Sequence, residues 1–311
     1  MRAPDFWQRP GLRAKLLSPL GILYGASVAR KARTATPWRA PVPVICVGNL
    51  TAGGSGKTPV AITIAQLLAA RGAKVFFLTR GYGGREKGPL LVAGHNAAQV
   101  GDEALLLAEH APTIVARDRA AGARLAVAQG AGVIVMDDGH QNFSLAKDVS
   151  LVVVDGQSGF GNRHVIPAGP LREPVAQGLA RADAVIVMGL GNPNLGNFVK
   201  PVLRAQLRAD GAAFKDQKVF AFAGIGRPEK FIDSLKSVGA LVTGTRFFPD
   251  HHPYRATEIA ALRRDAGDAL LVTTEKDLVR LDATTAQGIA MLKVAATFSD
   301  PRLLDSLLPP V

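Results

Sequence analysis

A glycine-rich segment that ends in lysine and threonine is the part of this sequence best suited to chemistry. Residues 51–58 read TAGGSGKT and lie between an apolar run and a helical pattern. They match the phosphate-binding pattern G-x-x-x-x-G-K-[ST] except at its first position, where Thr51 replaces glycine. Glycines let backbone N–H groups turn toward phosphate oxygens, and the N-terminus of the following helix favours negative charge. The alternative is a glycine-rich turn with an incidental lysine.

We therefore predict a P-loop that binds ATP. Lys57 would neutralise the outer phosphates, and the hydroxyl of Thr58 would bind Mg²⁺. The predicted nucleotide-binding residues are Thr51, Ala52, Gly53, Gly54, Ser55, Gly56, Lys57 and Thr58.

Two adjacent aspartates, Asp137 and Asp138, follow an apolar run that reads as a buried strand. A carboxylate at the end of such a strand lies beside the P-loop in this kind of sheet and is the usual second partner of Mg²⁺. Gln141 could add a contact to the metal or to a water. A solvated turn is the alternative interpretation of the aspartates.

Asp102 and Glu103 open a predicted helix, and two interpretations of Asp102 stay open. As a helix cap it would accept backbone N–H groups, with Glu103 as a first-turn charge. As a general base it would take the proton of a substrate hydroxyl.

Two neighbouring histidines, His251 and His252, lie in a loop that reads PDHHP. They could bind a metal, but no compact set of further ligands accompanies them. They could instead be a surface pair, or one of them could hold a carboxylate across a cleft between domains.

Several arginines follow predicted strands, where parallel strands would form a ligand crevice. They are Arg80, Arg117, Arg119 and Arg172. A guanidinium fork binds two oxygens at once, so their gathering favours an anionic substrate. Any one of them alone could equally be a solvated side chain.

These residues need a scaffold, and from residue 41 onward apolar runs alternate with helical patterns. This rhythm predicts an α/β fold of the P-loop NTPase kind, a parallel sheet with helices on both faces. The expected strands are Val42–Val47, Lys74–Leu78, Thr113–Ala116, Val133–Met136, Leu151–Val154 and Ala184–Met188, and the expected helices are Pro59–Arg71, Asp102–His110 and Ala120–Gln129.

A second cycle begins near residue 218 and predicts a smaller α/β domain. Its expected strands are Val219–Ala223, Leu241–Thr245, Ala269–Thr273 and Met291–Val294, and its expected helices are Pro228–Val238, Thr257–Ala266 and Pro301–Leu308. The polar, glycine-containing stretch 208–217 suits a boundary. We predict a basic amphipathic segment over residues 1–40, a P-loop kinase domain over 41–213, and over 214–311 a smaller domain that closes over the active-site cleft.

Positive charge is concentrated near the N-terminus. The 311-residue chain has a net charge of +12, and its first 39 residues carry eight lysines or arginines against one aspartate. Residues 16–29 are apolar, but Pro19 and two glycines interrupt them, and a bilayer span takes about 20 residues. An interfacial amphipathic helix that meets anionic lipid is one interpretation. A helix packed on its own domain is the other.

Composition narrows the function classes. The single cysteine, Cys46, excludes a disulfide within the chain and suits a reducing compartment. The sequence has no zinc-ligand spacing and no RNA-binding aromatic signature, so we expect no nucleic-acid partner. It lacks the N-K-x-D motif of GTPases, since its nearest string, residues 275–277, reads EKD. A membrane-associated ATPase switch and a soluble kinase or ligase for a small metabolite remain as rivals.

In order along the chain, these motifs resemble the tetraacyldisaccharide 4'-kinase family of lipid A biosynthesis. The resemblance rests on VGNLTAGGSGKTP, LTRGYGG, VGDE, ARDR, MDDGHQN, GPLREP, FFPDHHPY and TTEKD. It implies transfer of the ATP γ-phosphate to the 4'-hydroxyl of an acylated disaccharide phosphate, with Mg²⁺. It also implies peripheral attachment, through residues 1–40, to the cytoplasmic face of the bacterial inner membrane. We expect a monomer.

The resemblance also assigns roles by position. Asp102 becomes the implied base and pairs with a histidine of the DHH loop, for which we favour His251. The further implied catalytic residues are Lys57, Asp138 and Arg172, the substrate-binding residues are Arg80, Arg117, Arg119, Asn142 and Glu173, and the metal ligands are Thr58, Asp137, Gln141 and Glu103. Two positions depart from the family pattern: Ala104 stands where proline is expected, and Gly84 separates Arg85 from RGYG.

Overall fold

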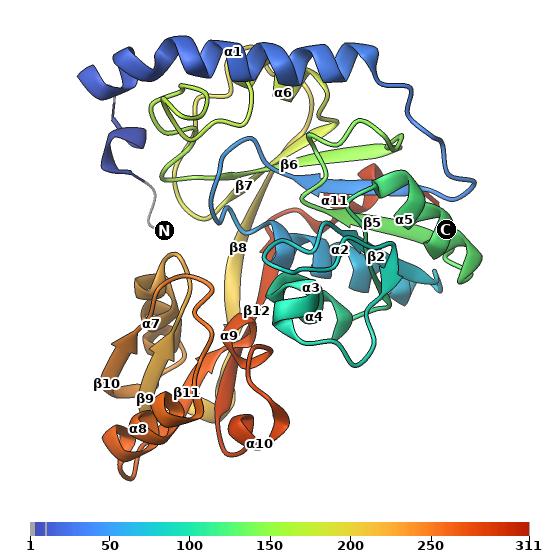
Figure 1. Cartoon of the computed structure of the whole chain (residues 1–311). Helices are drawn as coiled ribbons and strands as arrows, with labels where there is room; N and C mark the ends of the chain where they lie inside the picture. The colour runs from blue at the N-terminus through green and yellow to red at the C-terminus, as the bar shows by residue number, and fades with distance from the viewer. Residues whose placement is uncertain (1–3, 10, 311) are drawn as a thin grey trace.

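A twelve-stranded sheet runs through the whole molecule in the computed structural model, which describes residues 4–9 and 11–310 (Figure 1). The strands, in their order across the sheet, are β10 (Leu241–Phe247), β9 (Lys218–Ala223), β11 (Leu270–Thr274), β12 (Ala290–Phe298), β8 (Val202–Asp210), β7 (Ala184–Met188), β6 (Val149–Asp155), β1 (Val44–Gly48), β5 (Val133–Asp137), β2 (Val75–Thr79), β4 (Thr113–Val115) and β3 (Leu90–Leu91).

The helices are η1 (Asp5–Trp7), α1 (Leu12–Thr34), α2 (Lys57–Ala70), α3 (Ala97–Val100), α4 (Asp102–Ala108), α5 (Arg119–Ala128), α6 (Val175–Ala180), η2 (Ala212–Phe214), α7 (Pro228–Ser237), α8 (Ala256–Ala266), α9 (Glu275–Leu278), α10 (Ala283–Ala286) and α11 (Pro301–Leu307). We call the part from η1 to β7, together with α11, the first lobe. The part from β9 to α10 is the second lobe, and β8 and β12 run between the two (Figure 1).

The centre of the first lobe confirms the predicted parallel sheet with helices on both faces. β1 pairs in parallel with both β5 and β6, and every residue of β1 is buried. Because neighbouring residues of a strand point to opposite faces, Ile45 and Val47 pack on the α2 side while Val44 and Cys46 pack on the α5 side. The apolar run therefore folds as a strand covered on both faces.

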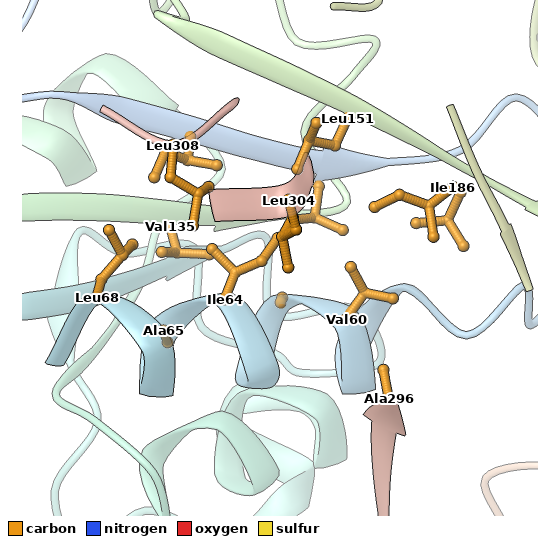
Figure 2. Packing of buried hydrophobic residues seen from close by; sticks show 14 of the residues in the cluster. Val60, Ile64, Ala65, Leu68, Val135, Leu151, Ile186, Ala296, Leu304 and Leu308 are labelled. Atoms are coloured by element: carbon orange, nitrogen blue, oxygen red, sulfur yellow. The ribbon is translucent and has the colours of Figure 1, made fainter. Parts of the chain in front are cut away.

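Helix α2 packs its apolar side on the sheet directly after the P-loop. Val60, Ile64 and Leu68 are completely buried and point toward Val135 and the strands beside it (Figure 2). Burying each of these side chains is worth about 1.5–3 kcal/mol, so the helix that carries the P-loop at its N-terminus is firmly fixed.

The second lobe repeats the same construction on a smaller scale. β9 pairs in parallel with β10 and with β11. Phe231 and Leu235 of α7 cover one face, and Ile259 and Leu262 of α8 belong to the core on the other face with Phe222. These elements lie close to the predicted ones.

A long antiparallel pair, β8 with β12, joins the lobes, and we did not predict β8. Its side chains alternate between buried and exposed at its start, but Arg204, Gln206 and Arg208 make the segment read as a polar linker. The end of β12 and α11 return to the first lobe, where Phe298 and Leu304 are buried in its core. Residues 296–308 thus pack with the first lobe, although the sequence grouped them with the smaller domain.

Helix α1 lies across the outside of the first lobe (Figure 1). Ala14, Gly21 and Gly25 are its buried residues, and a Cβ atom on Gly21 would lie 2.6 Å from the carbonyl oxygen of Val165. Its large apolar side chains point away from the protein and include Leu16, Leu20, Ile22 and Leu23, which are exposed. Within the described part of the chain, no helix has the length and apolarity needed to cross a membrane.

Candidate active site

The P-loop residues form a turn between β1 and α2, and Lys57 is the first residue of α2. Gly56 has φ 85°, a left-handed conformation that glycine adopts without strain. The amide of Asn49 donates to the hydroxyl of Ser55 at 3.1 Å, and the backbone N–H of Ala52 donates to the carbonyl of Pro170 at 2.7 Å. These hydrogen bonds hold the loop at the N-terminus of α2, which is where helices favour bound phosphate.

Asp137 lies beside the P-loop at the end of β5, as predicted. The Thr58 hydroxyl donates to Oδ2 of Asp137 at 3.0 Å, while Oδ1 of the same carboxylate is buried without a hydrogen-bond partner. Burial raises the pKa of Asp137, and the nearby Glu103 adds to this, whereas Lys57 lowers it. A buried carboxylate with one unsatisfied oxygen, beside a hydroxyl and a second carboxylate, fits a bound cation.

No group of three or more His, Cys, Asp or Glu side chains in residues 4–9 and 11–310 lies close enough to hold a metal alone. Mg²⁺ in nucleotide sites keeps several waters and takes its other ligands from phosphate, so one or two protein ligands suffice. The Thr58–Asp137 pair is compatible with that pattern.

Asp138, next in the chain, pairs with cationic side chains and not with Thr58. Its carboxylate accepts two hydrogen bonds from Arg172, at 2.7 and 3.0 Å, and lies 3.9 Å from Nζ of Lys57. Although burial acts in the opposite direction, Lys57 and Arg172 lower the pKa of Asp138 to about 2. The Asp138 backbone has φ 53°, which lets adjacent aspartates face different partners.

Glu173, the residue after Arg172, belongs to a buried hydrogen-bond network at the side of the site. Glu173, with a side chain 1% exposed, receives two hydrogen bonds from Arg181 at 2.8 and 2.6 Å. The Gln141 amide donates to Glu173 and to the carbonyl of Asn49, both at 2.9 Å. Glu173 therefore has little surface left for a substrate. We did not predict Arg181.

A second cluster crosses from the first lobe to the second. Oδ2 of Asp102, in α4, lies 2.8 Å from Nδ1 of His251, in the loop after β10. Arg280 donates to the same oxygen from Nε at 2.9 Å and from Nη2 at 2.5 Å. Lys276 lies 3.3 Å from Oε1 of Glu103 and 3.9 Å from Asp102.

Asp102 is thus not the helix cap, because Gly101 occupies that position. Burial would raise the pKa of Asp102, but His251, Lys276 and Arg280 together lower it well below its usual range. The carboxylate is therefore ionised. We assigned no role to Lys276 and did not predict Arg280, although both follow the end of β11 and are four positions apart.

The remaining candidates lie in different surroundings. His252 pairs with Glu258 at 3.0 Å within the second lobe and does not bind Asp102. Arg80 and Arg117 are exposed, whereas Arg119 is buried and its guanidinium donates to the carbonyl of Ala116 at 2.5 Å. Asn142 accepts hydrogen bonds from the backbone and hydroxyl of Ser144. The substrate-binding roles of these residues stay predictions.

Residues 13–310 match the model of the family described as LpxK: Tetraacyldisaccharide-1-P 4'-kinase. The chain belongs to this family. It is 53% identical to the tetraacyldisaccharide 4'-kinase of Paramagnetospirillum magneticum, with 99% of this chain and 98% of the relative aligned. It is 52% identical to the enzyme of the same name from Rhodospirillum centenum, over 100% of this chain and 97% of that one.

The fold agrees with a solved member of the family. The LpxK crystal structure from Aquifex aeolicus, in complex with ATP, superimposes with a TM-score of 0.77 at 27% identity and covers 96% of this chain and 98% of that one. Family membership confirms the resemblance found in the sequence and the class of kinase, and it disfavours the ATPase-switch interpretation. The family match begins at residue 13, so it includes most of α1.

Proposed function

We propose that this chain transfers the γ-phosphate of ATP to the 4'-hydroxyl of a tetraacyldisaccharide 1-phosphate lipid A precursor, in the presence of Mg²⁺. The observation that supports the proposal is the hydrogen bond of 2.8 Å between Asp102 and His251, which joins a carboxylate of the lobe that contains the P-loop to a histidine of the second lobe. Glu103, next in the chain, lies close enough to Asp137 to affect its pKa, so the two clusters adjoin.

The phosphates of ATP would lie on the backbone of the P-loop, with Lys57 against the outer phosphates. Thr58 and Asp137 would hold Mg²⁺, and Glu103 is the carboxylate whose charge acts on Asp137. When bound, the metal neutralises phosphate charge. Arg172 and Lys57 share Asp138 and would keep two positive charges at the place where the transferred group passes.

Asp102 would accept the proton of the acceptor hydroxyl as phosphoryl transfer proceeds. His251 orients the carboxylate through Nδ1, and its other ring nitrogen, Nε2, lies 3.7 Å from Asp250. Correct placement of the hydroxyl against the phosphate supplies a large part of the rate in such a reaction, because the transition state needs little covalent help. Arg80 and Arg117 are exposed cations for the phosphate that the substrate already carries.

The lipid substrate would reach the site along α1. Leu16, Leu20, Ile22 and Leu23 form an outward apolar surface, and the helix ends with Lys31 and Arg33 in its last turn. An exposed apolar face with basic ends suits the headgroup region of a bilayer that contains anionic lipid. On the inner side of the helix, a Cβ atom on the buried Gly25 would lie 3.5 Å from Pro174, two positions after Arg172, so α1 packs against the segment that carries Arg172. We infer peripheral attachment to the cytoplasmic face of the inner membrane, as a monomer and without nucleic acid.

The activity is tested by following label from γ-³²P-ATP into a monophosphorylated lipid A disaccharide in detergent micelles. We expect label on the lipid with the wild-type chain. The Lys57→Ala variant should lose roughly 100-fold or more of the rate, because it removes a preorganised positive charge. Lys236→Ala, an exposed lysine of α7, is the matched control. ATP hydrolysis without labelled lipid would contradict the proposal.

The membrane surface is tested by sedimentation with vesicles that contain phosphatidylglycerol. We expect the double variant Leu20→Ser and Leu23→Ser to bind at least about tenfold more weakly, because two exposed leucines no longer enter the bilayer. Leu241→Ser in β10 removes an exposed leucine of the second lobe and should bind as wild type. Equal losses in both variants would remove α1 as the membrane-facing element.

A further inference from the structure

We propose that Arg280 is a positioning residue that holds the Asp102 carboxylate in its working orientation from the second lobe. This inference rests on the function proposed above for Asp102. Arg280 acts through that carboxylate and has no contact with the reacting groups in our proposal.

The pair is buried and directional. Nε and Nη2 of Arg280 both donate to Oδ2 of Asp102, at 2.9 and 2.5 Å, and each side chain is only 4% exposed. A guanidinium that presents two neighbouring N–H groups fixes the direction of its partner as well as its charge. A lysine in this place could supply charge but not this geometry.

Arg280 is itself held by a rigid part of the second lobe. Its Nη1 donates to Oδ1 of Asp277 at 2.7 Å and to the carbonyl of Gly224 at 2.9 Å. Asp277 is completely buried and accepts hydrogen bonds from the Tyr254 hydroxyl at 2.8 Å and the Thr274 hydroxyl at 2.6 Å. The ends of β9 and β11 therefore set the position of the guanidinium.

The contacts distinguish the two oxygens of Asp102. Oδ2 receives Arg280 and His251, whereas Oδ1 accepts only the backbone N–H of Glu103, at 2.9 Å, among the described residues. The second lobe thus occupies one oxygen and leaves a lone pair of Oδ1 for the acceptor hydroxyl. If the lobes separate, Asp102 loses both side-chain partners that orient it, so the base is aligned only when the lobes meet.

A second ion pair between the lobes offers a control. Asp155, at the end of β6, lies 2.7 Å from Nη1 of Arg227 and 3.1 Å from Nζ of Lys230, both at the start of α7. This pair also joins the lobes but does not contact Asp102. If these ion pairs only held the lobes together, loss of Arg227 or of Arg280 would lower kcat equally. A positioning role makes only Arg280 important for turnover.

The experiment is a double-mutant cycle on the full chain, with kcat and the KM for ATP measured in detergent micelles. The variants are Arg280→Met and Asp102→Asn, alone and together. We expect Arg280→Met to lower kcat by about tenfold to 100-fold while the KM for ATP stays within about twofold. In the Asp102→Asn background, the same change should cost less than about twofold, because the group on which Arg280 acts is gone.

Arg227→Met should keep kcat within about threefold of wild type. Arg280→Lys keeps the charge and should recover part of the loss seen in Arg280→Met. It also serves as the test variant if Arg280→Met does not give a folded, monodisperse protein. Equal losses for Arg227→Met and Arg280→Met, or a full Arg280 effect in the Asp102→Asn background, would overturn the inference.

Failure of the proposed function gives a different result. If Asp102→Asn turns over lipid at the wild-type rate, the base assignment falls and this inference falls with it. If Asp102→Asn is slow but Arg280→Met and Arg280→Lys are both as fast as wild type, only the positioning role is wrong.

Discussion

The two halves of the candidate site differ in how many lobes they need. Lys57, Thr58, Asp137, Asp138 and Arg172 all belong to the first lobe, and their contacts form within one parallel sheet. The other half joins Asp102 of the first lobe to His251, Lys276 and Arg280 of the second. The phosphate half is therefore complete in one lobe, while the acceptor half exists only where two lobes meet.

This difference suggests an order of events. A nucleotide site within one lobe can bind ATP whatever the position of the other lobe. If Asp102 is the base, as proposed, the second lobe would align it only after the lobes have closed, which would limit phosphate transfer to water from an open site. The long β8–β12 pair, the covalent connection between the lobes, is where such closure would bend.

Variants of the two neighbouring histidines, His251 and His252, should separate the two halves of the site most clearly. We expect His251→Gln to lower kcat about 100-fold, because Asp102 loses an orienting partner, and to leave the Kd for ATP within about twofold. His252→Gln is the matched control, since His252 pairs with Glu258 inside the second lobe. Steady-state kinetics and equilibrium ATP binding provide the measurements. A loss of ATP affinity as large as the loss of kcat would show that the halves are not separate.

The stability of the phosphate half can be lowered by a variant that does not contact the acceptor half. Arg181→Met leaves the buried Glu173 without its two strongest hydrogen bonds, which should lower the free energy of unfolding by about 1–3 kcal/mol. Urea denaturation followed by tryptophan fluorescence measures the change. Arg208→Met in β8, an exposed arginine, should change it by less than about 0.5 kcal/mol. A similar change in both variants would show that the Glu173 network adds no stability.

A third test of the phosphate half uses acid. His140 is buried beside β1, with Nδ1 3.0 Å from the Ser150 hydroxyl and Nε2 2.9 Å from the carbonyl of Gly178. Burial lowers the pKa of His140 to about 3. The unfolded chain, with a histidine pKa near 6.5, therefore binds more protons than the folded chain between pH 6.5 and pH 3.

The free energy of unfolding should fall as the pH drops below about 6.5, with His140 contributing at most about 1.4 kcal/mol per pH unit, and this His140 contribution should level off near pH 3. Urea titrations between pH 7 and pH 4 measure the slope for wild type and for His140→Gln, which has no titrating ring. The variant should show a shallower slope. Identical slopes would mean that His140 is not kept neutral by the fold.

How well each half follows from the sequence depends on how local its signals are. Lys57 and Thr58 belong to one contiguous motif, and Asp137 follows a strand that topology places beside β1, so the phosphate half could be predicted. The resemblance to the family predicted that Asp102 pairs with His251, and the structure shows that contact.

The missing residues share a physical reason. Arg280 contacts Asp102 across 178 positions of sequence. Arg181 donates to Glu173 from the end of a short helix, and neither pairing leaves a periodic or local pattern. β8 was missed because a strand between lobes is exposed along much of its length and reads as a linker. The same exposure explains why the predicted boundary separated residues 296–308 from the core in which they are buried.

The pairing of β8 with β12 has a consequence for how this chain could have been assembled. Asp210 lies opposite Lys293, so the polypeptide leaves the first lobe and re-enters it at adjacent points. Such neighbouring ends are what an inserted module needs, because a short turn from Asp210 to Lys293 would close β8 and β12 into a hairpin. The second lobe, which carries His251 and Arg280, is thus an insertion between β8 and β12, and it does not interrupt the elements that carry Lys57 and Asp137.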